Sequence, residues 1–83
     1  MYRLRVERAA KKDLDRLAED QFQRVSEAIQ SLVQNPRPMG SLKLTGQEGI
    51  RLRVGDYRVV YDVDDKEQLV VVYRVKHRRE AYR

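Results

Sequence analysis

The sequence IRLRVGDYRVVYDVDD, residues 50–65, decides the fold. Apolar residues occupy every second position on both sides of Gly55-Asp56, a dipeptide that is typical of tight turns. The stretch therefore predicts a β-hairpin with a two-residue loop. A loop of that length sets Arg53 directly opposite Arg58 on the neighbouring strand.

The same alternation assigns the side chains of the hairpin to two faces. Successive residues of a strand point to opposite faces, so Arg51, Arg53 and Arg58 share one face and the apolar residues share the other. Like charges directly opposite each other destabilise a hairpin by up to about 1 kcal/mol. Solvated faces usually mix both signs of charge, and the guanidinium fork matches two phosphate oxygens at once. We interpret the arginine face as an anion-binding surface, with an ordinary solvated face as the alternative.

A third strand, residues 69–75, follows the polar turn DDKEQ. It is apolar at nearly every position, as in strands that are covered on both sides. Pairing Val63 with Leu69 predicts that Arg74 lies close to Arg58. This register puts three valines on the arginine face and three tyrosines on the helix-covered face: Val60, Val70 and Val72, and Tyr57, Tyr61 and Tyr73.

The N-terminal half predicts a strand and two helices. YRLRV, residues 2–6, alternates like a strand, and a helical pattern runs from about residue 8 to residue 19. Asp20 and Gln23 resemble a capping box at the start of a second helix, which NPRP ends. The glycine-rich segment MGSLKLTGQEG, residues 39–49, is interpreted as a loop.

The order of elements is therefore strand, helix, helix and three strands, followed by a short C-terminal tail or helix. This order predicts an α+β fold in which an N-terminal helical hairpin packs on one face of a largely antiparallel four-stranded sheet. With 83 residues, the chain corresponds to a single domain, residues 1–83.

Composition narrows the classes of function. The net charge of +5 favours a polyanion, above all nucleic acid, or an acidic protein partner. The chain has no cysteine and one histidine, so we expect no metal and no other cofactor. No apolar stretch approaches the roughly 20 residues that span a bilayer, and no signal peptide is recognisable. We therefore expect a cytoplasmic protein without a membrane partner.

Two motifs resemble those of a known family. GDYRVVY, residues 55–61, and HRREAYR, residues 77–83, are similar to motifs in the RelE branch of the RelE/ParE toxin superfamily. The resemblance implies the toxin of a type II toxin–antitoxin pair, an mRNA interferase that enters the ribosomal A site, cuts the messenger RNA there and inhibits translation. It also implies a RelB-like antitoxin, the ribosome and mRNA as partners, and a toxin–antitoxin hetero-oligomer.

The resemblance also implies a metal-independent endoribonuclease whose candidate catalytic residues are Arg51, Arg53, Arg58, Arg78 and Tyr82. Nearby cations favour the phenolate form of a tyrosine, which makes Tyr82 a candidate base. His77 is a further candidate for proton transfer, because an imidazole titrates near neutral pH. Candidate RNA-binding residues are Lys43, Arg74, Lys76, Arg79 and Arg83. The best-known members carry lysines at the positions of Arg51 and Arg53, so a strand lysine cannot act as base at these positions.

Two alternatives remain open at this level. The other branch of the superfamily has a similar fold and poisons DNA gyrase without cutting RNA, although its members generally lack the HRREAY tail. A noncatalytic RNA-binding or ribosome-binding module would keep the basic face and would not need Tyr82 or His77.

Overall fold

The computed structural model describes residues 1–43 and 49–81 and confirms the expected order of elements, with one additional strand. The elements are β1 (Arg3–Val6), α1 (Arg8–Asp15), α2 (Glu19–Ser31), β2 (Ser41–Lys43), β3 (Ile50–Val54), β4 (Tyr57–Asp64), β5 (Leu69–His77) and α3 (Arg78–Ala81). Within this described part, no helix is long and apolar enough to cross a membrane.

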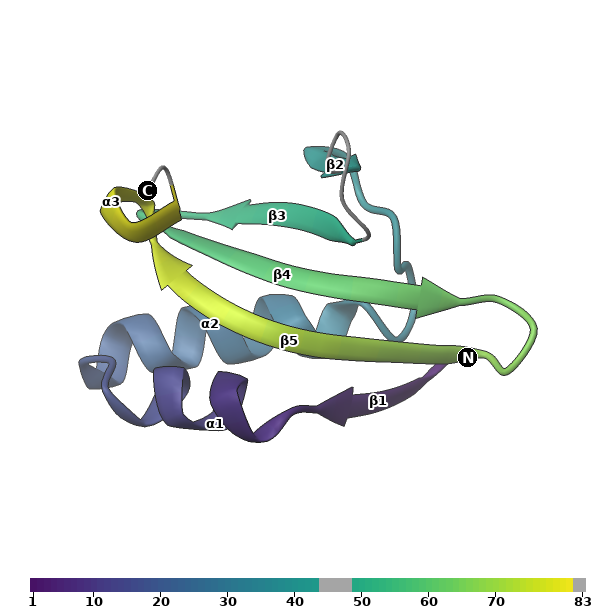
Figure 1. The fold of residues 1–83 in the computed structure, drawn as a ribbon, viewed down its shortest axis with the longest axis horizontal. Helices are drawn as coiled ribbons and strands as arrows, with labels where there is room; N and C mark the ends of the chain where they lie inside the picture. Colours follow the sequence, from purple (N-terminus) through teal and green to yellow (C-terminus); the bar gives the residue numbers. More distant parts are fainter. Residues whose placement is uncertain (44–48, 82–83) are drawn as a thin grey trace.

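The strands form one mixed sheet in the order β1-β5-β4-β3-β2. β1 runs parallel to β5, and the other neighbouring pairs are antiparallel. Figure 1 shows α2 behind the sheet and α1 next to it, below β5 in this view, and we call the side of the sheet away from the helices the uncovered face. The sheet has five strands and not the expected four, because Ser41–Lys43 pairs with β3. Three residues are too few for the alternation that reveals a strand in a sequence.

The apolar stripe of α2 packs on the helix-facing side of the sheet. Val25 and Leu32 are fully buried, and so are Val59 and Tyr61 of β4. The Tyr61 hydroxyl donates a hydrogen bond of 2.7 Å to the backbone carbonyl of Pro36, which satisfies this buried polar group. Burial raises the pKa of Tyr61 above its usual value.

The start of α2 differs from the predicted capping box. The N-cap residue is Ala18, which has no polar side chain, and Glu19 and Asp20 lie in the first turn. Carboxylates in a first turn interact favourably with the helix dipole. Asp20 therefore supports the helix from inside its first turn, and the prediction that it is the cap is wrong.

A β-bulge in β5 changes the faces of that strand. Tyr61 pairs with Val72 and Val60 pairs with Arg74, so Tyr73 is the extra residue. Val72 is fully buried, as is Val70, whereas Tyr73 is 40% exposed. The predictions that the two valines lie on the arginine face and that Tyr73 lies in the core are wrong, because Val63 pairs with Val70 and not with Leu69, and Tyr73 is the extra residue of the bulge.

The predicted partner of Arg58 on β5 is also wrong. Pairing Val63 with Leu69 would set Arg74 opposite Arg58. In the structure, Val63 pairs one residue further along β5, and beyond the bulge Arg58 pairs with Lys76. The shift of one residue at Val63 and the bulge at Tyr73 together place Lys76, and not Arg74, opposite Arg58.

Asp13 of α1 fastens β5 just beyond the bulge. Its carboxylate accepts hydrogen bonds from the Arg74 Nε at 2.8 Å, from the Arg74 Nη2 at 3.1 Å and from the Val75 backbone N–H at 2.8 Å. Burial opposes ionisation of Asp13, but these hydrogen bonds outweigh it and lower the pKa of the carboxyl group below its usual value. β1 pairs with β5 only as far as Val72. Beyond that point, Asp13 hydrogen-bonds to the edge of β5.

Candidate nucleic-acid interface

Three cations form a straight row across the uncovered face. Arg53 of β3 pairs directly with Arg58 of β4, as predicted, and Arg58 pairs directly with Lys76 of β5. Their neighbours in the alternation, such as Val59, belong to the core beneath the helices, so the three cations point to the opposite side. We call Arg53, Arg58 and Lys76 the cation row.

Arg51 lies on the same face, one pleat further from the turn. It pairs with Val60, which is half-buried, and Arg51 itself is half-buried. The three strand arginines therefore share one face, as the alternation predicts. Together with Lys76 they present four cations on three adjacent strands.

Arg58 is the most deeply buried charged residue of the cation row. It is 5% exposed, and its Nη1 donates a hydrogen bond of 3.2 Å to the backbone carbonyl of Tyr57. The exposed Arg53 donates from Nε to the carbonyl of Gly55 at 3.4 Å. In the described part of the chain, no carboxylate lies within 4.0 Å of any member of the row. A buried arginine is rare without a partner, so this end of the sheet suits an external anion.

The β3–β4 turn gathers two more arginines from helices. Gly55 has a φ of +58°, and a Cβ built on it would lie 3.3 Å from the Arg24 Nη1 of α2. The backbone N–H of Arg78 donates to the Asp56 carbonyl at 2.7 Å, and the Arg78 Nη1 lies 4.0 Å from the Asp56 Oδ1. Figure 1 shows α3 at this end of the hairpin. The contact between Arg24 and the turn depends on how α2 packs against the sheet, so the helical periodicity of the sequence could not predict it.

His77 lies on the other side of the sheet from the cation row. It pairs with Tyr57, and the two rings pack edge to face with centroids 5.3 Å apart and planes at 89°. Its Nδ1 accepts a hydrogen bond of 3.2 Å from the backbone N–H of Arg79. The structure therefore separates His77 from Arg58 and gives it packing and hydrogen-bonding roles at the start of α3.

The remaining candidate residues are spread over the molecule. Arg74 is held by Asp13 at the edge of β5, and Arg79 is exposed on α3. Lys43 lies on β2, at the opposite end of β3 from Arg53. Tyr82 and Arg83 lie outside the described residues, so their predicted roles stay predictions.

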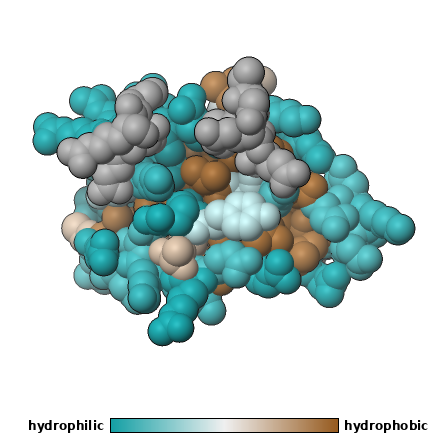
Figure 2. Space-filling model, in the orientation of Figure 1, coloured by the Kyte–Doolittle hydropathy of each residue, from teal (hydrophilic) through white to brown (hydrophobic). Residues whose placement is uncertain are grey.

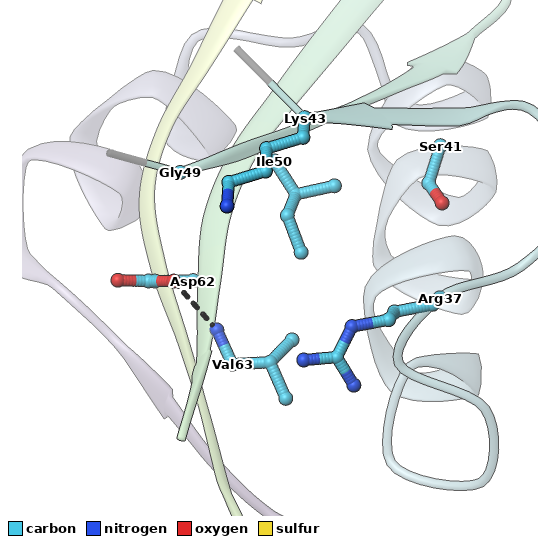
Figure 3. A pocket seen from close by; sticks show the side chains of 7 residues that line it. All are labelled: Arg37, Ser41, Lys43, Gly49, Ile50, Asp62 and Val63. Carbon is cyan, nitrogen blue, oxygen red and sulfur yellow. Dashed lines mark hydrogen bonds between the residues drawn. The ribbon is translucent and has the colours of Figure 1, made fainter. Parts of the chain in front are cut away.

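Lys43 borders an open depression of about 450 Å³. In Figure 3, the side chains of Lys43 and Arg37 point into this space, and the Asp62 carboxylate accepts the Val63 backbone N–H at 2.9 Å. Arg37 also forms a two-point ion pair with Asp65, at 3.1 and 3.0 Å. The depression is thus polar and distant from the cation row, and it does not join the arginine site. Its lining residues are Arg37, Ser41, Lys43, Gly49, Ile50, Asp62 and Val63.

The middle of the uncovered face is apolar. Val60 lies there, as predicted, and the observed register of β5 places Leu69 and Val71 there in place of Val70 and Val72. Figure 2 shows hydrophobic surface in the middle of this view, framed by hydrophilic side chains. The uncovered face therefore combines an apolar centre with a cationic end.

A helical hairpin behind a small sheet whose free face is rich in arginine defines a class of compact basic α+β proteins. A family model described as "ParE toxin of type II toxin-antitoxin system, parDE" matches residues 4–82. The chain is 33% identical over 84 residues to Toxin RelE of Mycobacterium tuberculosis, across 99% of this chain and 87% of that protein. The chain belongs to the RelE/ParE superfamily of type II toxin–antitoxin toxins.

Solved structures show the same fold. The toxin–antitoxin complex RelBE2 of Mycobacterium tuberculosis matches with a TM-score of 0.81 and 30% identity over 92% of this chain and 96% of that one. The archaeal RelE–RelB complex of Pyrococcus horikoshii matches with a TM-score of 0.80 and 30% identity over 93% and 94%. The intact E. coli RelBE complex matches with a TM-score of 0.75 and 28% identity over 93% and 96%.

Proposed function

We propose that this toxin is a ribosome-dependent endoribonuclease that cuts messenger RNA in the A site without a metal ion and thereby inhibits translation. The observation that carries the proposal is the cation row, which has no carboxylate within 4.0 Å in the described part of the chain, and Arg51 lies on the same face. The similarity to proteins named RelE supports the same function.

The chemistry of RNA cleavage suits such a row. The ribose 2′-oxygen attacks the adjacent phosphorus, an O2′–P bond forms, the P–O5′ bond breaks, and negative charge accumulates on the phosphoryl oxygens. Fixed cations that face those oxygens are commonly the largest catalytic contribution. Arg58 is anchored by the Tyr57 carbonyl and largely shielded from water, so it is the central charge stabiliser in this proposal.

Two residues of the C-terminal segment complete the proposed site. Arg78 follows β5 directly and is tied to the β3–β4 turn through Asp56, so it can place a further positive charge beside the leaving group. Tyr82 is proposed as the base that takes the 2′-hydroxyl proton. His77 is a weaker candidate than the sequence suggested, because its ring packs on Tyr57 on the other side of the sheet.

The same face is the proposed contact for an antitoxin. The RelE structures above were determined as complexes with RelB, and this chain offers an apolar centre bounded by arginines on its uncovered face. An acidic or amphipathic segment of a RelB-like antitoxin would satisfy both features. The resulting state is a cytoplasmic toxin–antitoxin hetero-oligomer in which the toxin is neutralised.

The test is cleavage of a defined message on stalled ribosomes. Purified toxin is added to ribosomes that hold a known codon in the A site, and the RNA ends are mapped by primer extension. We expect cuts within that codon, and none when ribosomes are omitted. Arg3→Ala, which removes an arginine from the far end of the same face, serves as the control and should cut normally. Intact messages in the presence of active ribosome binding would contradict the proposal.

Gyrase poisoning is the second candidate, because the matching family model is described as a ParE toxin. Trapped DNA breaks in cells that express the toxin, with their messages intact, would favour gyrase. A noncatalytic ribosome-binding module is distinguished by substitution of Arg58. Equal loss of ribosome binding and of growth inhibition, without any cut message, would favour that reading.

A further inference from the structure

We propose that Lys76 is the general acid of the cleavage reaction, the group that protonates the departing 5′-oxygen. The inference deepens the proposed function and rests on it. It starts from the composition of the cation row, in which two members are arginines and the third is a lysine.

The difference between these side chains decides which of them can transfer a proton. A guanidinium keeps its proton at any pH that an enzyme meets, because its pKa exceeds about 12, whereas an ammonium group exchanges its proton readily. Arg51, Arg53 and Arg58 can therefore bind phosphoryl oxygens but cannot act as acids. Lys76 is the one side chain of the row that carries both a positive charge and a transferable proton.

Lys76 is also well placed relative to the central arginine. It pairs directly with Arg58 on the adjacent strand, and side chains in such cross-strand pairs have their Cβ atoms about 5 Å apart. It is half-buried and faces the same side as the row. Arg58 is its direct cross-strand partner, and Arg78 follows it by two residues at the start of α3. A phosphate held by Arg58 thus lies within reach of the Lys76 ammonium.

The register of β5 selects this residue. If the Val63–Val70 register continued without a bulge, the apolar Val75 would stand opposite Arg58. The extra residue Tyr73 shifts the pairing by one position, so Lys76 takes this place, and Asp13 holds Arg74 at the strand edge.

His77 does not compete for the role, because it points to the helix-covered side. A base takes the 2′-hydroxyl proton as the O2′–P bond forms. As the P–O5′ bond breaks, its bonding pair moves to O5′, which takes a proton from the Lys76 ammonium. The products are a 2′,3′-cyclic phosphate, a 5′-hydroxyl and a neutral amine, which regains its proton from water.

A leaving-group substitution tests this role. Two messages are compared on stalled ribosomes, one with the normal 5′-oxygen at the cleaved linkage and one with sulfur in its place. A thiolate departs without protonation, because a thiol is far more acidic than an alcohol. Lys76→Arg keeps the charge and removes the transferable proton. We expect it to slow cleavage of the oxygen-linked message by about 100-fold or more and to cut the sulfur-linked message at the wild-type rate.

Lys66→Arg is the matched control, because it makes the same change in the exposed β4–β5 turn at the far end of the sheet. It should behave as wild type on both messages. If Lys76→Arg slows both messages equally, or neither, Lys76 is not the acid, and the proposed nuclease function stands. If the wild-type toxin cuts neither message, the proposed function is overturned together with this inference.

Discussion

The two ends of the sheet differ in whether their cationic side chains are paired with carboxylates. At the β4–β5 turn, Asp65 accepts two hydrogen bonds from Arg37 and one of 2.7 Å from the Tyr2 hydroxyl, and Arg3 lies 3.9 Å from Glu67. At the β3–β4 turn, the cation row has no carboxylate within 4.0 Å in the described part of the chain. One end is neutralised from within the molecule, whereas the other end suits an anion from outside it.

The difference separates an end that is stabilised by ion pairs from the end that we propose to bind RNA. Hydrogen bonds from Arg37 and Tyr2 lower the pKa of Asp65, and the Asp65 carboxylate raises the pKa of Tyr2, as expected of a satisfied surface network. Cations that face one another without such partners cost stability. The contrast between the two ends supports the binding role that we propose for the cation row.

The largest effect is expected for Arg58→Met, which keeps the buried aliphatic part of the side chain and removes its charge. We expect cleavage on the ribosome to fall by about 100-fold to 1000-fold, because a fixed charge opposite the phosphoryl oxygens is lost. The free energy of unfolding in urea should stay equal or rise, since repulsion with Arg53 and Lys76 is relieved. A destabilised variant with normal cleavage would show that Arg58 is a structural residue.

Asp13→Asn tests whether Asp13 anchors β5 in the register that places Lys76 opposite Arg58. The substitution weakens charge-assisted hydrogen bonds to Arg74 and Val75, so we expect a loss of about 1.5–3 kcal/mol in the free energy of unfolding. Asp15→Asn, an exposed change on the same helix, is the control and should cost far less. Equal values for the two variants would mean that Asp13 does not anchor the strand.

The pH dependence of stability sharpens the same point. The pKa of Asp13 is lowered in the folded state, so its contribution is present above the unfolded-state pKa of about 3.9 and is lost as the pH falls from there through the folded pKa. Thermal unfolding followed from pH 6 downward should therefore show a decline below about pH 5. In Asp13→Asn this decline should be smaller, and an unchanged profile would contradict the assignment.

Gly55→Ala probes the packing under the β3–β4 turn. A side chain at a φ of +58° is strained, and the added Cβ would meet the Arg24 guanidinium, so we expect a loss of about 1 kcal/mol or slightly more in urea unfolding. Adding Arg24→Ala should recover part of that loss. If the double variant recovers nothing, backbone strain alone accounts for the effect.

The smallest effect is expected at the neutralised end. Asp65→Asn removes an ion pair whose side chains are 51% and 58% exposed, and such pairs contribute about 0–1 kcal/mol. Urea unfolding should shift slightly, and cleavage should be unaffected because the pair lies far from the cation row. A large loss of cleavage would abolish the functional distinction between the two ends.

The sequence predicts the basic end better than it predicts β5. Alternation around Gly55-Asp56 was enough for the faces of Arg51, Arg53 and Arg58, and for the direct pairing of the last two. In β5, apolar residues fill consecutive positions, so no alternation marks a face and the bulge leaves no trace in the pattern. The register to β4 was wrong for this physical reason.

Contacts between distant segments were also hidden. The parallel pairing of β1 with β5, the anchoring of Arg74 by Asp13 and the position of Arg24 under the turn all join residues that are far apart in the chain. Helical periodicity shows only that Asp13 and Arg24 are polar residues on amphipathic helices. Their partners depend on how the helices are placed on the sheet.

The extra residue Tyr73 reverses which positions of β5 face the helices. Before Tyr73 in the chain, the even-numbered residues Val70 and Val72 face the helices, and after it the odd-numbered residues Val75 and His77 do so. One strand can thus bury its first half under the helices and display a lysine from its second half. Deleting Tyr73 would make Val72 and Arg74 consecutive and remove the bulge, while Val72 could still pair with Tyr61 and Lys76 with Arg58.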